Sequence, residues 1–168
     1  MPEAWETYYL MVGSSAGALI GLLFVVITLS GELDPDRGSI AQRTFLSPTI
    51  FHFVAVMVIS CAAVVTTLPP PAMAAVIAIP GVVGTVNAGI TLRTLTSGKL
   101  DVTHWTDYLY YGVLPAIGHV WLVIAAWAVW QGGGFGEYAV AAGAMALLLL
   151  GIRDAWDLAT WLTYHKKG

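Results

Sequence analysis

The chain has 168 residues, of which 58% are hydrophobic and only 10% are charged, with a net charge of −3. Soluble domains carry about 25% charged residues, so this composition predicts an integral membrane protein. No basic patch indicates nucleic-acid binding. The single cysteine, Cys61, excludes an internal disulfide, a CxxC redox pair and a zinc finger. Its apolar surroundings predict a small buried side chain.

Five hydrophobic stretches are long enough to cross a bilayer as helices. The predicted fold class is therefore all-α, a polytopic transmembrane helical bundle of about five spans that forms a single domain over residues 1–168. No Lys or Arg precedes the first stretch, which argues against a cleaved signal peptide. We place the spans at residues 8–30, 48–68, 72–93, 108–130 and 138–164.

Proline and glycine mark the connections between these spans. Pro69-Pro70-Pro71 separates span two from span three, and Gly132-Gly133-Gly134 predicts a turn between spans four and five. In the first loop, residues 39–46 could form a short interfacial helix. Ser47-Pro48 then supplies an N-cap and a proline at the first helical position of span two. Two further prolines predict kinks inside spans three and four: Pro80 and Pro115.

The distribution of positive charge predicts the topology. Odd-numbered spans run from one side of the membrane to the other, and all seven Lys and Arg residues fall on the side where span one ends. The positive-inside rule makes that side cytoplasmic, so the N-terminus is predicted outside and the C-terminus inside. These residues are Arg37, Arg43, Arg93, Lys99, Arg153, Lys166 and Lys167. Predicted aromatic belts comprise Trp5, Tyr8, Tyr9, Trp130 and Tyr138 outside, and Trp105, Tyr108, Trp156, Trp161 and Tyr164 inside.

Span one carries a ladder of small residues on one face, formed by Gly13, Gly17 and Gly21. Lipid supplies no hydrophobic drive between helices, so such a ladder predicts close backbone packing. Whether the partner is another span or another subunit is open from sequence, and we expect a homo-oligomer. Span three repeats the pattern with Gly81, Thr85 and Gly89, plus Gly84 and Ala88.

The last span carries an unusual run of ionisable residues. The uncharged stretch 138–152 has only 15 residues, roughly 22 Å as a helix, whereas a bilayer core is about 30 Å thick. The helix must therefore continue through Arg153, Asp154 and Asp157, where buried charge is costly and by default marks a site. Spacing along the helix predicts an Arg153–Asp157 pair, and Asp154 then needs a different partner. The alternative interpretation is an anchor that reaches the lipid headgroups.

Two histidines lie inside predicted spans, His52 about one turn into span two and His119 about three turns into span four, counted from the cytoplasmic side. They share a layer with Arg153 and Asp157 if spans two, four and five are neighbours. A predicted depth difference of about 9 Å between the histidines disfavours joint axial ligation of haem. No HxxxH or HxxE spacing indicates a metal site. Alternatively, His119 is a satisfied polar residue between helices, as expected for Asn87, and His52 is an interfacial histidine.

Three stretches together resemble a group of small bacterial integral membrane proteins of unknown function. Residues 13–25 (GSSAGALIGLLFV) resemble its glycine-and-serine span, and residues 47–53 (SPTIFHF) resemble its Pro-Thr-x-x-His-Phe segment. Residues 151–157 (GIRDAWD) resemble its Ala-Trp-Asp helix end, although a His-Asn pair is common there in place of Arg153-Asp154. The resemblance implies a multi-pass protein of the bacterial inner membrane and implies no activity.

These observations predict an ion or proton channel or a small transporter. Its pathway would be lined by His52, His119, Arg153 and Asp157, with Asn87 as a polar neighbour. Histidine titrates near neutral pH, so cytoplasmic pH could gate the pathway. The alternative is a non-catalytic scaffold or complex subunit that docks through span one, and a third interpretation is a haem- or quinone-binding protein. We predict no catalytic residue, cofactor or metal; the expected partners are membrane lipids and further copies of the chain.

Overall fold

The computed structural model describes residues 5–30, 46–65, 67–97 and 104–165. Five helical spans in these ranges are long and apolar enough to cross a membrane, which confirms the predicted all-α fold. They are α1 (Glu6–Ser30), α3 (Ser47–Val64), α4 (Pro70–Thr96), a fourth span built from α5 (Trp105–Asp107), η3 (Tyr108–Val113) and α6 (Leu114–Trp130), and α7 (Phe135–His165).

The boundaries of α3 differ from the predicted span. The helix ends at Val64 instead of residue 68 because Val65 has an extended backbone with φ −77° and ψ 93°. The proline run lies beyond the end of α3 and begins α4, whose first turn needs no backbone N–H donor from Pro70. At the other end, α3 already includes Ser47, so Ser47 is not the N-cap. The helix predicted over residues 39–46 lies outside the described residues, except for its last position.

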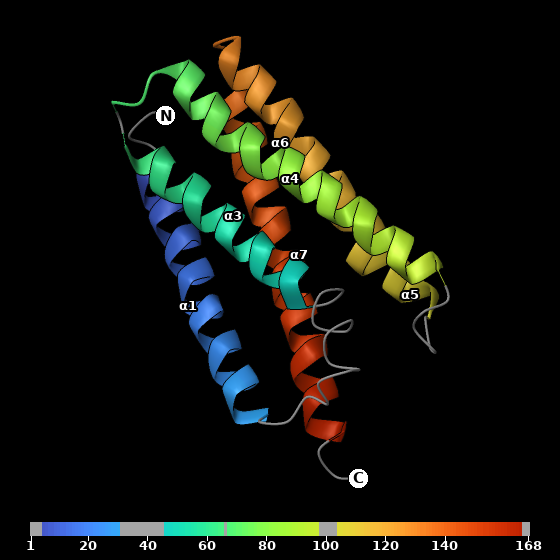
Figure 1. Ribbon diagram of the computed structural model, residues 1–168. Helices are drawn as coiled ribbons and strands as arrows, with labels where there is room; N and C mark the ends of the chain where they lie inside the picture. The colour runs from blue at the N-terminus through green and yellow to red at the C-terminus, as the bar shows by residue number, and fades with distance from the viewer. Residues whose placement is uncertain (1–4, 31–45, 66, 98–103, 166–168) are drawn as a thin grey trace.

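The five spans pack as two pairs joined by α7 (Figure 1). Helix α4 lies along α6, α1 lies along α3, and α7 contacts both α6 and α3. Helix α3 begins partway along α7 and not level with its end, since a Cβ atom on Gly151 would lie 2.6 Å from Cε1 of Phe53. This placement brings the first turns of α3 against the middle of α7 and not against its end.

The glycine ladder of span one packs within the chain. A Cβ atom on Gly13 would lie 2.8 Å from Cβ of Ser60 in α3, and one on Gly17 would lie 3.8 Å from Sδ of Met57. One on Gly21 would meet no atom of the described residues within 4 Å. The partner of Gly13 is therefore α3 of the same chain, and the homo-oligomer stays a prediction.

The turn between α6 and α7 is confirmed, and Gly132 adopts a left-handed φ of 72°, which favours glycine. At the same end of the bundle, the Trp5 ring lies 5.1 Å from the Tyr138 ring, so two members of the predicted outer belt are neighbours. Cys61 was expected to be buried and is instead exposed on the face of α3. Arg37, Arg43, Lys99, Lys166 and Lys167 lie outside the described residues, so the orientation stays a prediction.

Candidate functional site

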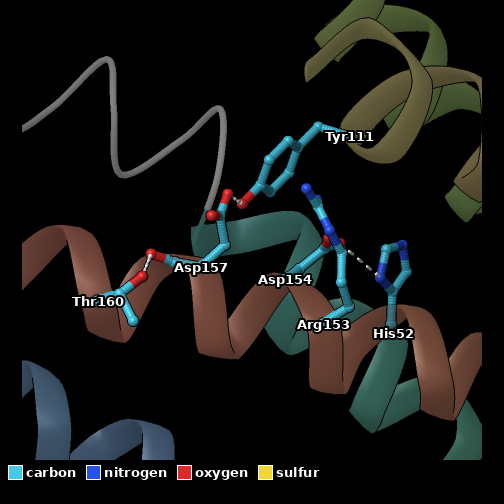
Figure 2. Close-up of polar contacts among 6 residues, drawn as sticks. All are labelled: His52, Tyr111, Arg153, Asp154, Asp157 and Thr160. Atoms are coloured by element: carbon cyan, nitrogen blue, oxygen red, sulfur yellow. Dashed lines mark hydrogen bonds and ion pairs between the residues drawn. The ribbon is translucent and has the colours of Figure 1, made fainter. Parts of the chain in front are cut away.

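Three ionisable side chains from three helices meet inside the bundle: His52 of α3, His119 of α6 and Asp154 of α7. Their exposed fractions are 2%, 1% and 0%. The two imidazole rings have centroids 5.3 Å apart and are tilted by 37°. Nδ1 of His52 lies 4.0 Å from Oδ2 of Asp154, and Figure 2 shows His52 facing the aspartate. We call these three residues the buried cluster.

Helix direction explains why these side chains converge. Side chains lean toward the N-terminus of their helix, and α7 runs opposite to α3 and α6 (Figure 1). Asp154 therefore leans toward the two histidines while they lean toward it. The predicted depth difference between His52 and His119 was wrong because it assumed that α3 begins at the membrane edge. Since α3 begins partway along α7, His52 lies deeper in the bundle than its position in the sequence indicates.

Helix α4 contributes a glycine to the site, and the His119 ring occupies the space that a side chain there would fill. A Cβ atom on Gly84 would overlap the Nδ1, Cε1 and Cγ atoms of the His119 ring. The ring of Phe51 lies 5.6 Å from the same imidazole. Asn87, on the next turn of α4, is half-buried and makes no hydrogen bond to the cluster within the described part of the chain. Gly84 was predicted only as a packing residue, and the structure places it against His119.

Arg153 pairs with Asp154 and not with Asp157, so the predicted Arg153–Asp157 pair was wrong. Nη1 of Arg153 lies 3.1 Å from Oδ1 of Asp154, and the arginine side chain is 34% exposed. Its guanidinium carbon lies 3.6 Å from the centroid of the Tyr110 ring, a cation–π contact that holds it toward the fourth span. Asp157 instead accepts a hydrogen bond of 2.9 Å from the Tyr111 hydroxyl (Figure 2).

Both tyrosines belong to the π-helical segment η3, which precedes Pro115. The N–H of Leu114 bonds to the carbonyl of Leu109, five residues back, where an α-helix would use the residue four back. Short π-helical segments occur frequently at functional sites. Sequence reasoning missed Tyr110 and Tyr111 as site residues; the signal available was an aromatic pair one turn before a proline inside a span.

Several atoms of the buried cluster have no hydrogen-bond partner among the described residues. They are Nδ1 of His52, both ring nitrogens of His119 and Oδ2 of Asp154. Buried polar atoms are normally paired, so such atoms are available to a proton or a small polar ligand. The two rings contact each other directly, so no porphyrin lies between them. No group of three His, Cys, Asp or Glu residues in the described ranges could hold a metal ion.

Fold and site together define a class, a polytopic α-helical membrane protein with ionisable side chains gathered inside the bundle. Comparison of the chain with protein-family models, with curated proteins and with solved structures found no match. The resemblance to a group of small bacterial membrane proteins and the bacterial inner membrane as location therefore stay predictions.

Proposed function

We propose that this protein is a small channel or transporter that moves protons through the buried cluster. The observation that carries the proposal is the burial of His52, His119 and Asp154 at a contact between three helices of a membrane bundle. Ionisable side chains inside a membrane are costly and commonly mark proton or ion pathways. The sequence alone supported an ion or a proton equally well.

Geometry favours the proton over a larger ion. The imidazole rings lie in contact, with centroids 5.3 Å apart, and leave no room between them for a hydrated cation. A histidine can accept a proton on one ring nitrogen and release one from the other. Arg153 already offsets the charge of Asp154 through a 3.1 Å contact, so a metal cation would have to compete with a fixed guanidinium.

The test is proton flux into proteoliposomes, driven by a potassium diffusion potential and read with a pH-sensitive dye inside the vesicles. We expect flux with the wild type and at least a tenfold loss with His119→Phe, which keeps a ring and removes both nitrogens. The matched control is His104→Phe, because His104 is an exposed histidine outside the cluster. Absence of flux from folded wild-type protein at every imposed potential would overturn the proposal.

A structural role is the second candidate, and two observations favour it. Arg153 pairs with the buried Asp154, and Gly84 fits the His119 ring closely. Such a cluster could fix the packing of a scaffold protein and carry no current. In that case His119→Phe would lower thermal stability, and wild-type vesicles would show no more proton flux than empty ones.

A further inference from the structure

We infer that the buried cluster exchanges protons with water only at the end of the bundle where α7 ends, because an apolar layer closes the other side. The layer consists of Val56, Leu122 and Leu147. The inference rests on the proposed function and assigns a sidedness to its site. It makes the structure a closed state of a gated pathway and not an open pore.

The apolar layer begins level with His119, where Leu147 packs against the neighbouring Gly118, and continues beyond both histidines. Val56 is one turn after His52 in α3, and Leu122 is one turn after His119 in α6. Together with Leu147 of α7 they are 0% exposed and belong to one cluster of buried hydrophobic residues.

Glycines let the two leucines of the layer close the contact between α6 and α7. A Cβ atom on Gly118 of α6 would lie 2.9 Å from Cδ2 of Leu147. A Cβ atom on Gly143 of α7 would lie 2.8 Å from Cδ2 of Leu122. Each helix thus receives a leucine of the other against its backbone, and little space is left between them from Gly118 to Leu122, about one helical turn.

Along α3, the layer separates His52 from Ser60, the next residue whose side chain has a buried polar atom without a hydrogen-bond partner in the described part of the chain. Ser60 is buried, and its hydroxyl has no hydrogen-bond partner among the described residues. The two residues are eight positions apart, which is roughly 12 Å along a helix. Val56 and Ile59, both 0% exposed, lie between them. Hydrophobic constrictions of this kind block ions by excluding water.

The opposite side of the cluster is polar. Asp154 contacts Arg153, whose side chain is 34% exposed. One turn further along α7, Asp157 is exposed and bonds to Tyr111. Charged groups therefore lie between the cluster and the surface toward the C-terminal end of α7. On the other side, the cluster is bounded by the apolar side chains of the layer.

Thiol labelling tests the sidedness. In a Cys61→Ala background, His119→Cys is treated with a small charged thiol reagent applied to one side of oriented vesicles at a time. Trp156→Cys and Tyr138→Cys, at two exposed positions of α7, mark the two sides. We expect His119→Cys to react at least tenfold faster from the Trp156 side than from the Tyr138 side. Equal rates, the reverse order or no reaction from either side would overturn the inference.

A substitution that makes a side chain of the layer smaller gives a second, independent test through proton flux. Leu122→Ala should raise proton flux at least fivefold, and His119→Phe should abolish that gain in the double variant. The matched control is Ile124→Ala, because Ile124 faces outward from the same helix and is 49% exposed. An unchanged flux for folded Leu122→Ala would contradict the layer as the barrier. Absence of flux in every variant, wild type included, would contradict the proposed function, while the labelling result would still decide the sidedness.

Discussion

Gly84→Ala should destabilise the bundle, because the added methyl group would occupy the place of the His119 ring. Overpacking a close-packed interior costs about 1–3 kcal/mol. The matched control is Gly89→Ala on the same helix, where a Cβ atom would meet no atom of the described chain within 4 Å. There the substitution should be neutral or stabilise α4 by up to about 1 kcal/mol, since alanine is the better helix former.

The two variants should therefore differ by about 1–4 kcal/mol in the free energy of unfolding. For a chain of 168 residues this corresponds to a difference in melting temperature of about 2–16 °C, at about 2–4 °C per kcal/mol. The measurement is thermal unfolding in one detergent, with all variants heated at the same rate because membrane proteins commonly unfold irreversibly.

A double-mutant cycle assigns the cost to the histidine ring. In a His119→Ala background the methyl group at position 84 has space, so the penalty of Gly84→Ala should fall close to zero. A penalty of unchanged size in that background would mean that Gly84 fits some other neighbour. A melting temperature of Gly84→Ala equal to that of the wild type would refute the packing argument itself.

Two further predictions rest on the contacts described above, and a third rests on the distribution of positive charge. A double-mutant cycle on thermal unfolding should find a coupling energy of about 1.5–3 kcal/mol between Arg153 and Asp154, as for hydrogen bonds between charged groups. The coupling energy between Arg153 and Asp157 should be near zero, and the opposite order would contradict the observed pairing. Gly13→Leu should lower the melting temperature because α3 lies against Gly13, whereas Gly21→Leu should be tolerated; equal effects would argue against the α1–α3 contact as its cause. A reporter active only outside the cell should work when fused before α1 and fail after α7, and the reverse would overturn the predicted orientation.

The number and approximate limits of the helices could be predicted because they depend on the length of apolar runs, a property of each segment alone. The depth of His52 could not be predicted in the same way. It depends on where α3 begins relative to α7, and the contact that reveals this, Phe53 against Gly151, joins residues far apart in the chain.

The partner of Arg153 was also outside the reach of sequence reasoning. Positions 153 and 157 lie on one face of a helix, and for an isolated helix that spacing favours their pairing. In the bundle, Tyr110 holds the guanidinium and Tyr111 bonds to Asp157, so residues of another span decide which carboxylate the arginine contacts. The charged run could thus be recognised from sequence as a candidate site, although its internal connections could not.

The π-helical segment η3 also accommodates one extra residue in the fourth span. A turn closed by a bond to the fifth residue back holds one residue more than a turn closed to the fourth. Deleting a single residue inside it, for example Val113, would place Leu109 four residues before Leu114, so the same bond would close an ordinary α-helical turn and the chain before Leu109 would keep its rotational phase. Tyr110 and Tyr111 lie inside this turn, so their positions relative to α7 would change. The alignment of both aromatic residues with the charged run is therefore a matter of chain length as much as of residue type.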